Sequence, residues 1–184
     1  MEIIRNLKEI TFLKGVFLTL SATIILAISA KIKIPFYPVP MTMQTFVVLL
    51  IGVIFGWKLG LVTVSLYLFE GLIGLPVFAG TPEKGMGLSY FIGPTMGYLI
   101  GFLAAAFLSG FFKYSRNYIL NFLKLMLSVS LIYIFGMLWL SNFTGWEKVF
   151  MVGAQPFLLA ELFKISLLSI LIPQILRLKS TKPI

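Results

Sequence analysis

The sequence predicts an all-α integral membrane protein with six transmembrane helices in a single domain, residues 1–184. Hydrophobic residues make up 59% of the chain and charged residues 11%, whereas soluble domains carry about 25% charged residues. The apolar runs recur along the whole length. The basic residues lie between these runs and form no stripe interleaved with aromatic residues. The net charge of +9 therefore fits a polytopic membrane protein better than a nucleic-acid-binding protein.

Six apolar segments are candidate spans, since a helix crosses a bilayer with about 17–25 residues. The first fifteen residues carry acidic groups and no cleavage site of small residues, so we interpret them as an uncleaved lead-in to the first span. The second and third segments are short and predict a hydrophobic hairpin. Proline favours the first turn of a helix, which supports helix starts near Pro94 and Pro156. The expected spans are 12–30, 42–55, 59–72, 95–112, 118–140 and 156–176.

The distribution of basic residues predicts how the protein is oriented. With six spans, both termini lie on the same side as the turns at 57–58 and 113–116, and most Lys and Arg residues fall on that side. Cytoplasmic segments carry an excess of Lys and Arg, so we expect both termini in the cytoplasm and the protein in the cell membrane. The residues on this side are Arg5, Lys8, Lys14, Lys58, Lys113, Arg116, Lys124, Arg177, Lys179 and Lys182.

Three external segments are expected to form an ordered cap over a substrate pocket. They are 31–41, 73–94 and 141–155, and all are rich in Pro, Gly and aromatic residues. Irregular backbone at membrane depth is tolerated where it is buried in protein or lines a cavity. Their aromatic content argues against disorder.

Three ionisable residues near membrane depth are candidates for function, because charges inside spans are costly. Glu161 and Lys164 are three residues apart on the last helix, so they share a face and can pair. They could serve a ligand with an N–H donor and an acidic or carbonyl group, or they could simply neutralise each other. Glu70 lies near the external end of the third span. Gln44 could offer both a donor and an acceptor.

A stripe of small residues runs along the first helix. Thr23 and Ala27 are four residues apart, with Ala22 beside them. Such a stripe either packs inside the protein or docks a partner helix.

Several chemistries are excluded by what the sequence lacks. The chain has no Cys and no His, so it has no thiol catalysis and lacks the commonest metal ligand and general base. No P-loop of the GxxxxGK[ST] type is present. We therefore expect neither an enzyme nor a metal or cofactor site.

Four motifs together resemble the BioY family, the biotin-specific substrate-binding (S) components of energy-coupling factor (ECF) transporters. The motifs are IPFYPVPMTMQTF, LYLFEGLIGLPVFAG, GPTMGYLIGF and QPFLLAELFK, in that order. The resemblance implies a six-helix S-component fold that binds biotin beneath the external loops. It also implies ligand contact by an acidic residue and a lysine three positions later, here Glu161 and Lys164. The family usually has aspartate at the first of these positions, so Glu161 adds one methylene.

The chemistry of biotin agrees with these residues. Its ureido N–H groups suit Glu161 and an amide such as Gln44, and its carboxylate suits Lys164, although the sequence leaves open which polar group meets which end. The ring and chain need an apolar lining. Candidates for that lining are Phe36, Tyr37, Phe78 and Tyr90.

The predicted function is therefore capture of biotin outside the cell and delivery inward. The resemblance implies a transmembrane coupling (T) component and two ATPase subunits as partners, tilting of the S component in the membrane, and docking through Ala22, Thr23 and Ala27. One alternative is a stand-alone secondary transporter that uses Glu161 and Glu70 as proton or ion sites. Others are an S component for another vitamin, and a membrane enzyme or assembly factor.

Overall fold

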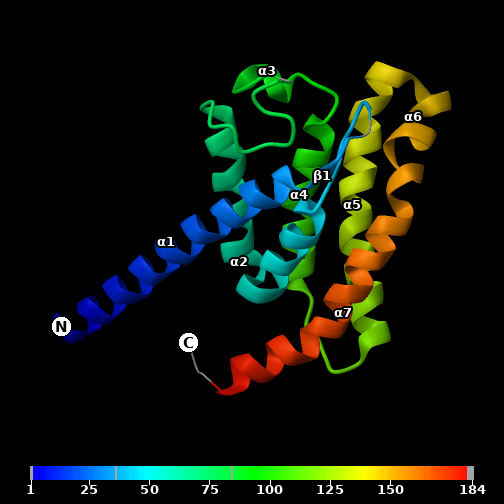
Figure 1. The fold of residues 1–184 in the computed structure, drawn as a ribbon. Coiled ribbons are helices and arrows are strands. Elements are labelled where there is room, and N and C mark those ends of the chain that lie inside the picture. Colours follow the sequence, from blue (N-terminus) through cyan, green and yellow to red (C-terminus); the bar gives the residue numbers. More distant parts are fainter. Residues whose placement is uncertain (1, 36, 84, 182–184) are drawn as a thin grey trace.

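The computed structural model describes residues 2–35, 37–83 and 85–181, and side chains from residue 13 to residue 177 apart from 36 and 84. Most of this part of the chain is helical (Figure 1). Its helical stretches Leu13–Lys31, Gln44–Leu72, Tyr118–Thr144 and Trp146–Arg177 are long and apolar enough to cross a membrane, and Met96–Phe111 is a shorter apolar helix. The elements are α1 (Glu2–Lys31), β1 (Lys33–Ile34), β2 (Met41–Thr42), α2 (Gln44–Leu72), α3 (Leu88–Phe91), α4 (Met96–Phe111), α5 (Tyr118–Thr144), α6 (Trp146–Gly153), the 3₁₀ turn η1 (Gln155–Phe157) and α7 (Leu158–Thr181).

Helix α2 folds back on itself and supplies two membrane segments. Gly56 has φ 75° and ψ 173°, which breaks the helix, and glycine adopts such positive φ values at little cost. The amide of Gln44 donates a hydrogen bond to the hydroxyl of Tyr67 at 2.6 Å. In one straight helix these residues would be about 35 Å apart at 1.5 Å per residue. The two halves are therefore antiparallel, and the predicted six-helix membrane fold is confirmed.

Helices α4 and α5 approach closely through glycine. A Cβ atom added at Gly101 would lie 2.6 Å from the Cα of Ile132 on α5. Gly97, one turn earlier, faces the backbone of α5 in the same way. Small residues at such positions let transmembrane helices pack backbone to backbone. Tyr98 and Phe102 of α4 and Tyr133 of α5 line the same pocket, where the candidate site lies.

The irregular and short elements gather at one end of the bundle. Strands β1 and β2 form an antiparallel hairpin in which Lys33 pairs with Thr42 and Ile34 with Met41. This hairpin, α3 and α6 lie at the end opposite the turn at Gly56 (Figure 1). The segment 141–155, expected to be a loop, is mostly helical, because Gly145 at φ 75° ends α5 and α6 begins at once. Helix α7 begins two residues after the expected start at Pro156, because η1 occupies the first turn.

The small-residue stripe of α1 packs inside the protein. Ala22 and Thr23 are 4% and 2% exposed, and Ala27 packs partly buried against the core. The hydroxyl of Thr23 donates a hydrogen bond to Oε1 of Glu70 on α2 at 2.9 Å. Of the two roles expected for this stripe, packing within the chain is the one present in this structure. Docking of a partner helix through Ala22, Thr23 and Ala27 stays a prediction, and Ala22 and Thr23 are buried in this conformation.

Candidate ligand-binding site

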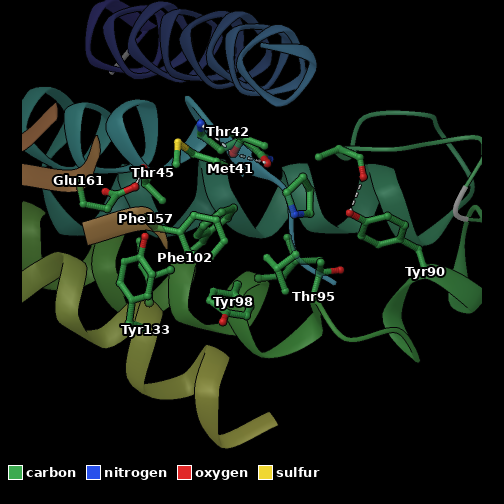
Figure 2. Close-up of a pocket in the computed structure, with 16 residues that line it drawn as sticks. Met41, Thr42, Thr45, Tyr90, Thr95, Tyr98, Phe102, Tyr133, Phe157 and Glu161 are labelled. Carbon is green, nitrogen blue, oxygen red and sulfur yellow. Dashed lines mark hydrogen bonds between the residues drawn. The ribbon is translucent and has the colours of Figure 1, made fainter. Parts of the chain in front are cut away.

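A pocket lies beneath the capped end, between the β1–β2 hairpin and helices α2, α4, α5 and α7 (Figure 2). Its volume is about 50 Å³, room for a few water molecules at about 10–15 Å³ each. A bicyclic organic ligand therefore requires the walls to move apart. The lining residues are Val39, Pro40, Met41, Thr42, Gln44, Thr45, Ala79, Tyr90, Thr95, Tyr98, Leu99, Phe102, Ile132, Tyr133, Phe157 and Glu161.

One corner of the pocket is polar and holds a buried ion pair. Nζ of Lys164 lies 2.7 Å from Oε1 of Glu161, and their side chains are 6% and 7% exposed. The same ammonium donates to the carbonyl of Thr42 at 2.6 Å and to the hydroxyl of Thr45 at 3.0 Å. A lysine has three N–H donors, so all three are in use. Lys164 stands behind Glu161 and does not line the pocket.

The carboxylate of Glu161 presents an unused oxygen to the pocket. Oε1 accepts from both Lys164 and the hydroxyl of Thr45. Oε2 is buried and has no hydrogen-bond partner among the described residues. Leaving a buried acceptor unsatisfied costs about 1–3 kcal/mol, and more when it is charged. This oxygen is therefore suited to accept a hydrogen bond from an N–H or O–H group of a ligand.

Gln44, the first residue of α2, is a second polar residue in the wall of the pocket. Its amide nitrogen donates to the hydroxyl of Tyr67, which in turn donates to the carbonyl of Val77 at 2.8 Å. Its amide oxygen accepts from the hydroxyl of Thr42 at 3.2 Å. One amide N–H and one lone pair remain, so Gln44 can both donate to a ligand and accept from it.

The rest of the pocket wall is aromatic. Tyr98 and Tyr133 meet edge to face with ring centres 6.1 Å apart, and Phe157 lies 6.3 Å beyond Tyr133. The hydroxyl of Tyr98 donates to the carbonyl of Gly153 at 2.7 Å, so its polar end is satisfied within the protein. The hydroxyl of Tyr133 points toward the side of the pocket where Glu161 lies (Figure 2). Flat apolar groups fit between such ring faces.

Tyr90 closes the pocket on the side of α3. Its hydroxyl donates to the carbonyl of Ala79 at 2.8 Å. Burial raises the pKa of this phenol, so it remains protonated and can keep donating. Phe78, stacked on Tyr90 with ring centres 4.9 Å apart, is 1% exposed and lies behind the wall, outside the lining set.

The predicted site residues thus fall into distinct places. Gln44, Tyr90 and Glu161 line one pocket, while Lys164 and Phe78 lie directly behind it. The side chain of Tyr37 is 90% exposed and lies outside this lining set. Phe36 lies outside the described residues.

Sequence reasoning missed part of the wall. Phe102, Tyr133 and Phe157 line the pocket, and so does Thr45, which bonds Glu161. One signal was available for Phe157: it precedes Glu161 by four residues in a segment expected to be helical, and residues at this spacing share a helix face. Tyr133 stands out only as a hydroxyl within an apolar run.

Comparison with known proteins identifies the family. The model of the BioY family matches residues 5–181. The chain belongs to the BioY family. The probable biotin transporter BioY of Pyrococcus horikoshii is 36% identical over 138 residues, 75% of this chain and 81% of that protein. The biotin transporter BioY of Thermotoga maritima is 35% identical over 145 residues, 78% of this chain and 84% of that protein.

A solved structure agrees with this membership. The crystal structure at 2.1 Å of the S-component for biotin from an ECF-type ABC transporter superposes with a TM-score of 0.78 and 26% identity, covering 91% of this chain and 93% of that one. The resemblance and the S-component fold predicted from the sequence are confirmed. These BioY relatives are named as transporters, which also confirms that the chain is no enzyme.

Proposed function

We propose that this BioY-family chain is the biotin-binding S component of an ECF-type importer. The observation that supports biotin as the substrate is the buried Oε2 of Glu161, which has no hydrogen-bond partner among the described residues and lies in an aromatic pocket. Biotin combines two ureido N–H donors with an apolar bicyclic ring. An acceptor fixed among ring faces complements that combination, since a few placed polar groups in an apolar pocket set orientation and specificity.

In the proposed pose, the ureido group lies between Glu161 and Gln44. One N–H donates to Oε2 of Glu161, and the free amide N–H of Gln44 donates to the ureido oxygen. The ring then lies against the faces of Tyr98, Tyr133 and Phe157. Lys164 orients the carboxylate of Glu161 by the 2.7 Å ion pair. Direct contact between Lys164 and the ligand would require the loss of one of its three present hydrogen bonds.

Calorimetric titration of the purified protein with biotin tests the proposal. We expect one-to-one binding, a loss of at least tenfold in affinity for Glu161→Gln, and a comparable loss for Gln44→Leu, since each removes a hydrogen bond to a group buried in the complex. Glu147→Gln, at an exposed position on α6, is the matched control and should bind like the wild type. A folded protein that fails to bind biotin, or that binds thiamin or riboflavin more tightly, would refute the biotin assignment.

The partners and location follow as part of the same proposal. We place the chain in the cytoplasmic membrane with both termini inside, and we propose a transmembrane coupling component and two ATPase subunits as partners. Since α2 covers Ala22 and Thr23, a partner that meets α1 in this conformation contacts its exposed apolar side, which includes Phe17, Ile24 and Ile28. Biotin uptake that needs the ATPase subunits supports this assembly, and uptake driven by a pH gradient without them would favour a secondary transporter.

A further inference from the structure

The loop 77–81, which joins α2 toward α3, forms the outer cover of the pocket. Ala79 lines the pocket, and Phe78 and Ala79 are 1% and 3% exposed. Because the cavity is about 50 Å³, entry or exit of a bicyclic ligand requires a wall to move. Residues 77–81 form neither helix nor strand, so this loop is the wall that can move without breaking the backbone hydrogen bonds of a helix or a sheet.

Two buried tyrosines hold this loop from inside the protein. The hydroxyl of Tyr67 donates to the carbonyl of Val77, and that of Tyr90 donates to the carbonyl of Ala79, both at 2.8 Å. Both tyrosines belong to helices next to the loop in sequence. These bonds fix the inner side of the loop.

A lysine from a distant helix holds the same loop from outside. Nζ of Lys31, at the end of α1, donates to the carbonyl of Phe78 at 3.1 Å, to the carbonyl of Thr81 at 3.2 Å and to the hydroxyl of Thr81 at 3.1 Å. All three N–H groups are therefore engaged by the loop. Lys31 is exposed and Thr81 is 6% exposed. Hydrogen bonds with one charged partner are stronger than neutral ones.

We propose that Lys31 is a positioning residue that fastens the loop 77–81 over the pocket and so controls the rates at which ligand enters and leaves. The inference rests on the proposed function, because it takes biotin as the ligand that passes the loop. The bonds of Lys31 go to Phe78 and Thr81, neither of which lines the pocket, so they stabilise the closed loop with and without ligand. Their loss lowers the barrier to opening in both states and leaves the affinity nearly unchanged.

The expected signature is a change in rates at nearly constant affinity. For Lys31→Met in lipid nanodiscs we expect association and release of radiolabelled biotin both to be about tenfold faster, about 1.4 kcal/mol, with the dissociation constant within about twofold. Lys31→Arg keeps the cation and its donors and should restore most of the wild-type rates. Lys33→Met is the matched control, since Lys33 is exposed at the same end of the bundle and, among the described residues, the lysine that bonds the loop 77–81 is Lys31. The rates of Lys33→Met should equal those of the wild type.

Hydrogen exchange on the ligand-free protein provides a readout that does not depend on biotin. Peptides covering 77–85 should exchange faster in Lys31→Met, and not in Lys33→Met. Should Lys31→Met fold poorly, Thr81→Val removes one acceptor of the lysine and should give a smaller change in the same direction. Wild-type rates and exchange in Lys31→Met would overturn the inference, as would weaker affinity at an unchanged release rate. A wild type that binds no biotin would refute the proposed function, and the exchange result would still decide whether Lys31 fastens the loop.

Discussion

Removing the ammonium of Lys164 is expected to destabilise the protein by leaving a carboxylate uncompensated at membrane depth. In Lys164→Met, Oε1 of Glu161 keeps only the hydroxyl of Thr45 as a donor, and its side chain is 7% exposed. A charge near the centre of a transmembrane helix costs about 2.5–3.5 kcal/mol on insertion scales. Breaking one side of a buried ion pair in soluble proteins costs about 3–5 kcal/mol. We therefore expect a loss of about 3 kcal/mol, or about 6–12 °C in Tm for a chain of this size.

The double variant makes this reasoning testable. Glu161→Gln alone leaves Lys164 unpaired and should lose a similar amount, whereas Glu161→Gln with Lys164→Met carries no unpaired charge and should be more stable than either single variant. The assay is thermal unfolding in nanodiscs without biotin, followed by tryptophan fluorescence. Glu147→Gln, at an exposed position on α6, is the control and should change stability by less than about 0.5 kcal/mol. A double variant that loses the sum of the two single effects would refute charge compensation between these residues.

Three further substitutions test the packing that forms the pocket, each by thermal unfolding. Gly101→Ala should cost about 1–3 kcal/mol of stability because its methyl group meets the backbone of α5. Gly15→Ala is the control: its methyl group meets nothing within 4 Å, so it should not destabilise the protein. Equal effects of the two substitutions would contradict the close packing of α4 and α5. Tyr67→Phe removes the hydroxyl that accepts from Gln44 and donates to the carbonyl of Val77. It should cost about 1–3 kcal/mol of stability and weaken biotin binding. Wild-type stability and binding would exclude a role for this hydroxyl. Gly56→Ala forces a methyl group into positive φ and should cost about 1–2 kcal/mol; unchanged stability would show that the turn tolerates other conformations.

The helices could be predicted from the sequence because the bilayer imposes a simple rule on length and polarity. The turn at Gly56 followed from the same rule, since a single crossing cannot accommodate the apolar residues on both sides of it. Glu161 and Gln44 could also be predicted as candidates from the sequence, because a charged or amide side chain within an apolar segment usually marks a polar site. These predictions depend on single residues that differ from their neighbours.

The aromatic wall was harder to predict because it is assembled from distant parts of the chain. The hydroxyl of Thr45 meets Lys164 from 119 residues away, and Tyr133 is one of many large side chains on α5. The direction of Tyr37 was unpredictable for another reason: a hairpin with strands of two residues offers no alternation from which to read inward and outward positions. The α1 stripe was ambiguous because small residues serve packing and docking equally well.

The short helices on either side of the Gly56 turn have a consequence for the lipid around the protein. The second half of α2, residues 57–72, measures about 24 Å at 1.5 Å per residue, and Val62 and Phe69 on it are each 55% exposed. The hydrocarbon core of an average bilayer is about 30 Å thick. On this side the bilayer must become thinner or flanking polar side chains must extend toward the interface, at a cost of fractions of a kcal/mol per Å of hydrophobic mismatch. Acyl-chain length is therefore a variable that acts on the stability of this protein, and lipids with shorter chains lower the cost of this mismatch.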